Sequence, residues 1–274
     1  LELEGYRVFT ATSVPDAISH LETTPADLVI TDLKMPKVSG MDLVRHVREN
    51  LPATEVMMIT GVLGAAAQNE FRRILSFHII SQVGYMAMGL ALQTRLALAG
   101  TIFYLIHHII VKANLFLVSG VVKRLQGSFE LSQLGGIYRS HGWIAFLFFI
   151  PAFSLAGFPP LSGFWAKMIL IRASLDIHAY WLAFVAAAVG LLTVYSMTKI
   201  WAEVFWKPAP VINHAAEPMT ARNISAWMLA PIAALAMLTI ITGIGAEFVF
   251  RFALQAAEEL SHPEYYVHAV LGKS

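Results

Sequence analysis

The stretch AGTIFYLIHHIIVKANLFL, residues Ala99–Leu117, decides how the rest of the chain is interpreted. It is apolar almost throughout, and its length matches one bilayer crossing of about 20 residues. Its middle nevertheless carries His107, His108 and Lys112. A charged side chain at the bilayer centre costs about 2.5–3.5 kcal/mol on insertion scales, so a lysine there indicates a function inside the membrane.

Two of these polar residues share one face of the predicted helix. His108 and Lys112 are four positions apart, so their side chains lie one turn from each other. We therefore expect this pair to handle protons within the membrane. His107 points about 100° away from His108 around the helix, and we expect it to pack against a neighbour or to face lipid.

The composition indicates a membrane protein. The chain is 57% hydrophobic and 14% charged, against about 25% charged residues in soluble chains. Residues 1–70 carry 5 Lys/Arg and 10 Asp/Glu, whereas residues 71–274 carry 14 and 8. The net charge of +1 therefore combines an acidic head with a basic, apolar body.

Several classes of function are not expected from this composition. The chain has no cysteine, which excludes disulfides and thiolate metal sites, and we expect no metal and no cofactor. No run of Lys and Arg indicates nucleic-acid binding. The first residues, LELEGYRVF, lack the basic and apolar regions of a secretory signal.

Residues 1–61 alternate between strand and helix patterns. The expected order is strand, helix, strand, helix, strand, at Tyr6–Ala11, Val14–Leu21, Asp27–Asp32, Met41–Glu49 and Glu55–Thr60. Such an order predicts a small parallel α/β sheet, in which sites form at the carboxyl ends of the strands. Asp32 and Thr60 lie at two such ends.

A junction over residues 62–71 leads into a helical membrane domain, residues 72–255, and a polar tail, residues 256–274. We expect five apolar spans, each long enough for a bilayer crossing. They are Ile74–Leu92, Leu96–Val121, Trp143–Ser174, Tyr180–Phe205 and Ile224–Phe252. The predicted fold class is therefore mainly α, a five-span transmembrane bundle preceded by a partial α/β head.

The third span contains a predicted helix break. The sequence GFPPLSG, with Gly157, Pro159, Pro160 and Gly163, should interrupt the helix. Irregular backbone at membrane depth is tolerated only where protein or a water cavity covers it, and broken helices of this kind build ion sites in transporters. Lys167 lies just beyond the break, so it joins the candidates for proton transfer.

For the other polar residues of the spans we expect structural contacts. We expect His78 at the membrane interface, with Ser81 and Gln82 adding polar contacts in the bundle. Lys199 and Glu203 are one turn apart and should form a pair.

The basic residues that flank the spans favour one orientation in the membrane by a small margin. With the head in the cytoplasm, seven Lys and Arg flank the spans inside and four flank them outside. The inside residues are Arg72, Arg73, Lys123, Arg124, Arg139, Lys207 and Arg222, and the outside residues are Arg95, Arg172, Arg251 and Lys273.

The head resembles part of a response-regulator receiver domain. The stretch DLVITDLKMPKVSGMDLVRHVRE is similar to the segment around the phosphorylated aspartate, which puts Asp32 in that place. By this resemblance Thr60 would be the hydroxyl residue of the phosphorylation switch. The family's acidic pair for Mg²⁺ and its final lysine are not found in this stretch, so a surface role for Asp32 is the other interpretation.

The body resembles the C-terminal half of the antiporter-like membrane subunits of Mrp-type Na⁺/H⁺ antiporters and respiratory complex I. The matching motifs are RRILSFHIISQVGYMAMGL, FYLIHHIIVKANLFLVSG and LAGFPPLSGFWAKMIL. By this resemblance Lys112 and Lys167 would be proton-channel lysines, with His108 bridging them. Where the family has a further histidine, this chain has Tyr104, whose hydroxyl would take part in the relay.

The resemblance implies a proton-translocating antiporter subunit in a bacterial cell membrane, a transporter rather than an enzyme. At most it would be the membrane arm of a complex like NADH:quinone oxidoreductase. The expected partners are the lipid bilayer, other membrane subunits, H⁺ and Na⁺. Because only half of the family's length is matched, we expect a truncated subunit. Two alternatives stay open, a phosphorelay receiver fused to a membrane domain and a non-functional fusion.

Overall fold

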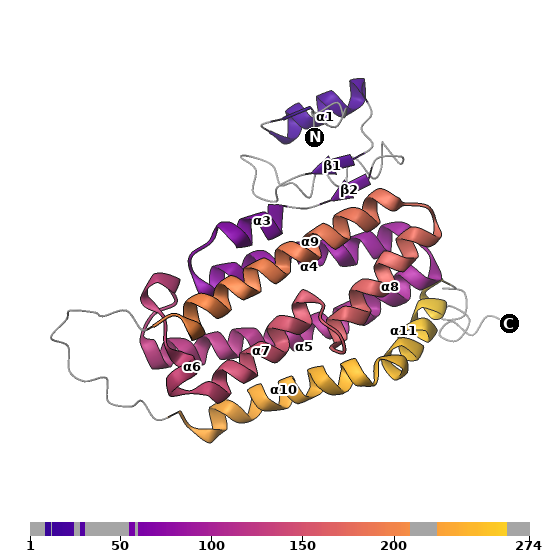
Figure 1. Cartoon of the computed structure of the whole chain (residues 1–274). Helices are drawn as coiled ribbons and strands as arrows, with labels where there is room; N and C mark the ends of the chain where they lie inside the picture. The colour runs from indigo at the N-terminus through magenta and orange to yellow at the C-terminus, as the bar shows by residue number, and fades with distance from the viewer. Residues whose placement is uncertain are drawn as a thin grey trace, which may run out of the picture. The chain divides into compact units, whose positions relative to one another are not determined.

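The computed structural model of the chain describes residues 9–11, 13–24, 28–30, 55–57, 60–208 and 224–261. Its contacts divide the chain into two compact units, Leu1–Gly61 and Val62–Ser274, and the second is called the helical unit below. Figure 1 shows the elements with their labels.

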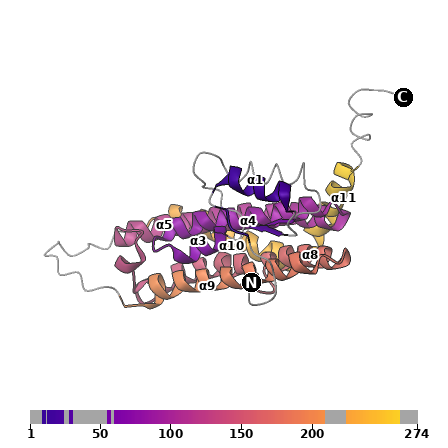
Figure 2. The same cartoon turned by 90° about the horizontal axis from the view of Figure 1, so that it is seen from above.

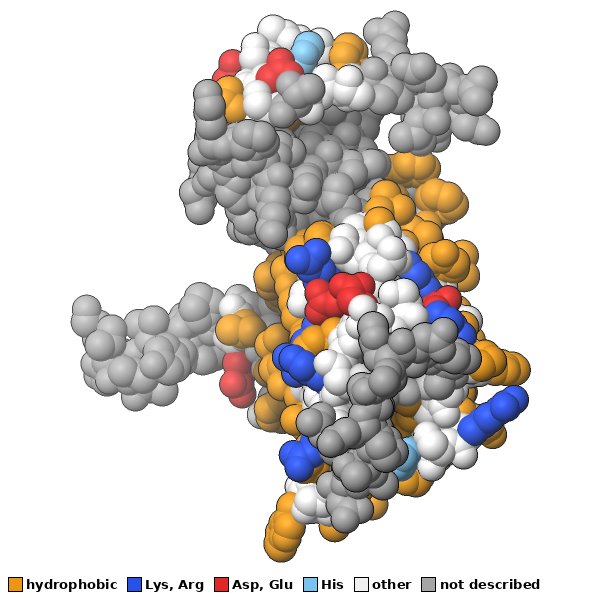
Figure 3. Space-filling model, turned by 90° about the vertical axis from the view of Figure 1, so that its left-hand side faces the viewer, with side chains coloured by type: hydrophobic (Ala, Val, Ile, Leu, Met, Phe, Trp, Pro, Cys, Tyr) orange, Lys and Arg blue, Asp and Glu red, His pale blue; other side chains and the backbone are white. Residues whose placement is uncertain are grey.

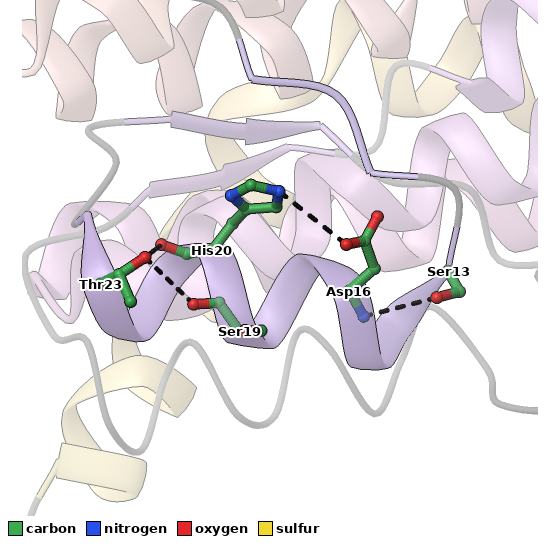
Figure 4. Close-up of polar contacts among 5 residues, drawn as sticks. All are labelled: Ser13, Asp16, Ser19, His20 and Thr23. Atoms are coloured by element: carbon green, nitrogen blue, oxygen red, sulfur yellow. Dashed lines mark hydrogen bonds and ion pairs between the residues drawn. The ribbon is translucent and has the colours of Figure 1, made fainter.

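The first unit contains α1 (Val14–Thr23) and two short parallel strands, β1 (Leu28–Ile30) and β2 (Glu55–Met57). The Ser13 hydroxyl caps α1 by accepting a hydrogen bond from the Asp16 backbone N–H at 3.4 Å (Figure 4). One turn on, His20 Nε2 lies 3.8 Å from Asp16 Oδ1. The helix and both strands occur where the sequence pattern predicts them.

The structure corrects one predicted strand of residues 1–61, and other predictions for this region fall partly or wholly outside the described residues. The strand predicted over Glu55–Thr60 ends at Met57, and Thr60 opens helix α3 (Thr60–Ala67) rather than ending a strand. Asp32 and the helix Met41–Glu49 lie outside the described residues. Of the strand predicted over Tyr6–Ala11, residues 9–11 are described, and they do not belong to a strand. The described part of the head therefore does not establish a receiver fold.

The helical unit is a bundle of long apolar helices, as predicted. Four helices are long and apolar enough to cross a membrane, among the residues that the structure describes. They are α4 (Phe71–Leu92), α5 (Arg95–Gln126), α9 (Tyr180–Ile200) continued by the π-helix η3 (Trp201–Trp206), and α10 (Ala226–Ile244). In Figures 1 and 2 these helices run side by side.

The predicted third span is divided as expected. Helix α7 (Gly142–Ala156) ends at Gly157, whose φ of 97° is a left-handed conformation that favours glycine. Helix α8 (Ser162–Asp176) begins after the two prolines. The break predicted over Gly157–Gly163 is therefore present.

The last predicted span is two helices in the structure and not one. The sequence pattern predicts a single helix from Ile224 to Phe252, but α10 ends at Ile244 and α11 (Ala246–Ser261) begins after Gly245. Helix α11 thus includes residues 256–261, which the sequence pattern assigns to the polar tail. The Arg95 guanidinium and the Glu258 carboxylate, 2.6 Å apart, fasten it to the start of α5.

Helix α5 lies at the centre of the helical unit. It packs against α4, α7, α8, α10 and α11. The Thr94 hydroxyl caps its first turn by accepting from the Ala97 N–H at 3.1 Å, and Gly127 ends it in a left-handed conformation. This position brings the polar residues of α5 against several other helices.

Short elements close one end of the helical unit. The one-turn helices η2 (Leu131–Gln133) and α6 (Ile137–Ser140) lie between α5 and α7. Backbone hydrogen bonds join Phe71 to Phe129 and Gly136 to Lys207, so the start of α4 and the end of η3 meet this loop. In the view of Figure 3, Lys and Arg side chains lie at several separate places among hydrophobic ones.

Candidate functional site

Lys112 points from α5 toward α4 inside the helical unit. Only 5% of the residue is exposed, and its Nζ donates a hydrogen bond to the Leu75 carbonyl oxygen at 2.9 Å. Within a helix that carbonyl oxygen already accepts the bond of the residue one turn further on, so Lys112 uses its second lone pair. The amine is therefore held at a fixed point of α4.

Lys167 spans the break in the third crossing. It is 6% exposed, and its Nζ donates to the carbonyl oxygen of Ala156, the last residue of α7, at 3.1 Å. Carbonyl groups at the end of a helix have no partner within that helix, so the amine satisfies one of them. Its Nζ also lies 5.4 Å from the centre of the Tyr85 ring. A side chain of α8 thus links the two half-helices.

Two glycines lie beside the Lys167 side chain, and Gly157 is the one at which a larger residue would be crowded. A Cβ atom at Gly157 would lie 3.1 Å from Lys167 Cδ, at a backbone conformation that other residues rarely adopt. A Cβ atom at Gly190 of α9 would lie 3.8 Å from Lys167 Nζ and 3.6 Å from the Tyr85 hydroxyl. Lys167 therefore ends in a small space between α4, α7 and α9.

Along α4, His78 lies between Leu75, whose carbonyl oxygen binds Lys112, and Tyr85, whose ring lies near the Lys167 amine. His78 and His107 each interact electrostatically with both lysines, whereas His108 interacts with Lys112 alone of the two. His78 is fully buried against the other helices, and the interfacial position expected for it stays a prediction. Neither of its ring nitrogens has a hydrogen-bond partner among the described residues, so both are available for proton exchange.

A hydrogen-bonded row continues from His78 along α4. The Ser81 hydroxyl donates to the His78 carbonyl oxygen at 3.1 Å, and Gln82 Nε2 donates to Ser81 Oγ at 2.9 Å. The Tyr104 hydroxyl of α5 donates to Gln82 Oε1. The Tyr104 ring stacks on Tyr85 with ring centres 5.2 Å apart. Tyr104 therefore connects α5 to α4, and its part in a proton relay stays a prediction.

Of the two positions expected for His107, packing against a neighbour or facing lipid, the structure has the first. The residue is 1% exposed, and its Nδ1 lies 2.8 Å from Ser162 Oγ at the start of α8. A Cβ atom at Gly163 would clash with the Ser154 carbonyl oxygen and would lie 2.9 Å from His107 Cε1. Gly163 is therefore required for the close approach of α5 to the break, next to Pro159 and Pro160.

The predicted pair of Lys199 with Glu203 is not formed. Lys199 Nζ donates to the carbonyl oxygens of Ala66 and Gln68, at 3.0 and 2.8 Å, and to Asn69 Oδ1 at 3.2 Å. Glu203 pairs with Lys207 at 2.9 Å. Lys199 thus holds the turn between α3 and α4 and does not extend the lysine row.

Sequence reasoning could have found His78 but not the partner of His107. His78, Gln82 and Tyr85 follow one another at helical spacing, so a polar stripe on α4 is visible in the sequence. The contact of His107 with Ser162 joins residues 55 positions apart and has no local signal. Where the structure describes the chain, no three His, Asp or Glu side chains gather into a possible metal site.

Comparison with known protein families gives two matches. The model described as NADH:quinone oxidoreductase/Mrp antiporter, TM matches residues 53–193, which is 141 of the 274 residues. The model of the response regulator receiver domain matches residues 1–79. The two matches overlap over residues 53–79.

Individual relatives agree with the first match. The chain is 49% identical over 214 residues to the D subunit of the Na(+)/H(+) antiporter of Alkalihalophilus pseudofirmus, and 35% identical over 217 residues to that of Bacillus subtilis. Each alignment covers 78% of this chain and 42% of the relative. The chain therefore spans less than half the length of these curated relatives.

Solved structures share the fold. A chain of the Mrp complex from a Dietzia species superposes with a TM-score of 0.70 at 35% identity, over 77% of this chain and 46% of that chain. A chain of respiratory complex I from Thermus thermophilus gives a TM-score of 0.65 at 20% identity, over 74% and 42%. With its apolar helices and these relatives, the chain is a multi-pass membrane protein, and it belongs to the NADH:quinone oxidoreductase/Mrp antiporter family.

Proposed function

We propose that the helical unit translocates protons as a subunit of an Mrp-type cation/proton antiporter. Lys112, His78 and Lys167 would carry the proton, with His108 and Tyr104 beside them. The observation that supports this most is the pair of buried amines, each bonded to a backbone carbonyl oxygen, with a buried imidazole in reach of both. Ionisable groups inside a membrane bundle rarely have a purely structural role.

Proton translocation along this row would need two proton transfers. Lys112 gives its proton to one ring nitrogen of His78, and the other ring nitrogen releases a proton to the Lys167 amine. An imidazole can accept at one nitrogen while it donates at the other, and a lysine kept from water can act as both acid and base. The centre of the Tyr85 ring lies 5.4 Å from Lys167 Nζ, so a cation–π contact would join the Ala156 carbonyl oxygen in holding a charged amine at this end of the row.

The Tyr104–Gln82 contact would keep this row aligned. It fixes α5 against α4 at the level between the lysines, and the stacked Tyr85 ring connects it to the Lys167 end. His108 lies one turn from Lys112 and is 8% exposed, more than either His78 or His107, so it would deliver protons to that lysine.

Partners and location follow from the same proposal. Other membrane subunits would complete the transporter, as the chain matches less than half of each relative. The exchanged ions would be H⁺ and Na⁺, because the relatives in Alkalihalophilus pseudofirmus and Bacillus subtilis belong to Na(+)/H(+) antiporters. Residues 1–61 would form a separate head on the cytoplasmic side of a bacterial cell membrane, since more basic residues flank that side.

The test uses everted vesicles from cells that lack Na⁺/H⁺ antiporters and express the full chain. Addition of Na⁺ should release protons from acidified vesicles, measured by recovery of acridine orange fluorescence. Lys112→Ala, Lys167→Ala and His78→Gln should each reduce the initial rate at least tenfold. Lys207→Ala removes a surface lysine of the same unit and serves as the matched control, with an unchanged rate.

Two outcomes would contradict the proposal. A rate that survives all three substitutions would show that the proton does not use this row. No transport by a correctly inserted chain, alone and with the other antiporter subunits, would favour the non-functional fusion.

The receiver match over residues 1–79 supports a second candidate function, a phosphorelay head. Asp32 would accept the phosphoryl group, and Thr60 would be the switch hydroxyl. Incubation of the full chain with acetyl phosphate and Mg²⁺ should then give a phosphoprotein that Asp32→Asn does not form. Equal incorporation by both proteins, or none by either, would remove this candidate.

A further inference from the structure

Positive charge is in excess at the end of the helical unit that η2 and α6 close, on the left in Figure 1. Among the described residues, this end carries six Lys or Arg side chains and three Glu side chains. Two of the acidic groups are already paired, Glu70 with Arg73 at 3.1 Å and Glu203 with Lys207 at 2.9 Å. An anion is therefore attracted to this end. The basic residues are Arg72, Arg73, Lys123, Arg124, Arg139 and Lys207, and the third acidic residue is Glu130.

Arg72 of α4 and Lys123 of α5 meet at the ring of Phe129. Arg72 Cζ lies 4.2 Å from the centre of that ring, and Lys123 Nζ lies 4.6 Å from it. The two charges are therefore no more than about 9 Å apart, roughly one Debye length in physiological salt, so they repel each other. Neither forms an ion pair with a carboxylate where the structure describes the chain. An anion close to both would remove this repulsion.

The position of Arg72 is fixed while most of its guanidinium stays available. Its Nε donates to Ser119 Oγ at 3.3 Å, which ties α4 to α5. This is the side chain's one hydrogen bond to the described residues, so the N–H groups of Nη1 and Nη2 are left for a ligand. Phe129 is also held in place, because its carbonyl oxygen accepts from the Phe71 N–H at 2.9 Å. The site is therefore formed before a ligand binds.

Helix lengths put Arg72 and Lys123 at the level of the lipid headgroups. Residues 74–92 of α4 contain no Lys, Arg, Asp or Glu. They extend about 28 Å at about 1.5 Å per residue, close to the ~30 Å of the hydrocarbon core of a bilayer. On α5, Arg95 and Lys123 are separated by about 42 Å, close to the thickness of about 40–45 Å that includes both headgroup layers. Both helices thus put the Phe129 ring in one headgroup layer.

We propose that Arg72, Lys123 and Phe129 bind the phosphate of an anionic phospholipid of the phosphatidylglycerol type. The fork of N–H groups on Arg72 holds two phosphate oxygens, the geometry in which guanidinium groups bind phosphate well. Lys123 is exposed and its stem is flexible, so its amine turns from the ring toward the same phosphate. The bound phosphate neutralises the repulsion between the two cations.

A lipid uses more of this surface than a free phosphate ion does. Phe116 and Ile109 lie on the same face of α5 as Lys123, at helical spacing toward the middle of the bilayer. Phe116 is partly exposed and Ile109 is 60% exposed, so both contact acyl chains. Basic groups between membrane helices at headgroup level are a recurring site for anionic lipids. Phosphatidylcholine carries its own cation beside the phosphate, so it gains less from the site.

The first experiment compares ligands. The full chain in a neutral detergent is titrated with phosphatidylglycerol or with phosphatidylcholine of the same acyl chains, and native mass spectrometry counts the bound lipids. We expect one phosphatidylglycerol to be retained several-fold more strongly than phosphatidylcholine, and inorganic phosphate should not displace it. Equal retention of the two lipids, or displacement by inorganic phosphate, would overturn the proposal.

The second experiment compares variants. Arg72→Gln and Lys123→Gln should each lower the affinity for phosphatidylglycerol several-fold. Arg139→Gln removes the same charge from an exposed side chain of α6 at the same end, so it is the matched control and should leave the affinity unchanged. Arg72→Gln also loses the bond to Ser119, whereas Lys123 has no hydrogen bond to the described residues, so Lys123→Gln reports binding even if Arg72→Gln does not fold. An equal loss in Arg139→Gln would show general attraction of anions and no site.

The third experiment locates the phosphate. The full chain, labelled with ¹³C-arginine, is studied by solid-state NMR in phosphatidylglycerol bilayers, and the Arg72 signal is assigned by its loss in Arg72→Gln. Dipolar coupling to ³¹P should place Arg72 Cζ about 4 Å from phosphorus, as in a bidentate pair. Arg95 lies at the other headgroup layer but is paired with Glu258, so its coupling should be weaker. Equal coupling of Arg72 and Arg95 would contradict a specific site.

The same measurement distinguishes a lipid from a protein partner. When the other antiporter subunits are assembled with the chain, the coupling of Arg72 to ³¹P should persist. Its loss on assembly would show that a carboxylate of another subunit occupies this surface, which would overturn the lipid as the ligand. These measurements do not need transport, so their failure would leave the proposed function untouched.

Discussion

Replacing Lys199 with methionine should detach the turn between α3 and α4. Methionine keeps a similar length and apolar stem but removes three hydrogen bonds, to Ala66, Gln68 and Asn69. A bond from a charged donor contributes about 1.5–3 kcal/mol when it is buried. Lys199 is half-buried and Asn69 is exposed, so water replaces part of this interaction. We expect a loss of about 1–3 kcal/mol in the free energy of unfolding.

The assay combines a global and a local measurement. Unfolding of the detergent-solubilised chain by SDS gives the change in free energy, and hydrogen exchange locates it. The increase in exchange should be confined to residues 60–70, because the other contacts of α9 do not involve Lys199. Lys207→Met, which breaks only the surface pair with Glu203, should change stability by less than about 0.5 kcal/mol. Equal effects of both substitutions, or unchanged exchange over residues 60–70, would refute the reasoning.

Three further substitutions test the packing. Gly163→Ala should lower the free energy of unfolding by about 1–3 kcal/mol and reduce transport, because the added Cβ would overlap the Ser154 carbonyl oxygen. SDS unfolding measures this loss, and an unchanged stability would contradict the close approach of α8 to α7. Tyr85→Phe removes only the hydrogen bond to the Ala186 carbonyl oxygen and should lower the free energy of unfolding by about 0.5–1.5 kcal/mol. Tyr85→Leu should lower it further, because the stacking on Tyr104 is also lost. Arg95→Ala breaks the surface pair with Glu258 and should cost at most about 1 kcal/mol, less at high salt; a salt-independent loss would show that α11 is held otherwise.

The sequence predicts the bundle and two of its buried lysines for a physical reason. A charge inside an apolar span is so costly that Lys112 and Lys167 stand out without any knowledge of their neighbours. The break is equally visible, because prolines and glycines cannot continue a helix. Both features depend on local properties of the chain, and both are found where the pattern predicts them.

The predictions that failed or stayed open concern which face of a helix meets a neighbour. This depends on how each helix is rotated about its own axis, which the local sequence does not determine. Helical geometry separates His107 from His108 correctly, but the sequence does not state that two faces of α5 are buried. The nearness of His78 to the start of a span favours an interfacial position, although its face of α4 turns inward. The Lys199 and Glu203 spacing fits an ion pair, but oxygens from the α3–α4 turn compete more effectively for the amine.

The place of Lys167 has a consequence for how the third crossing can move. One nitrogen atom belongs to α8, binds the final carbonyl of α7 and would hold the transported charge. A change in the protonation of that atom therefore alters the fastening of the two half-helices at the same moment. Under the proposed function, the charge on Lys167 and the joint between α7 and α8 would therefore be coupled, since a substitution at Lys167 changes both.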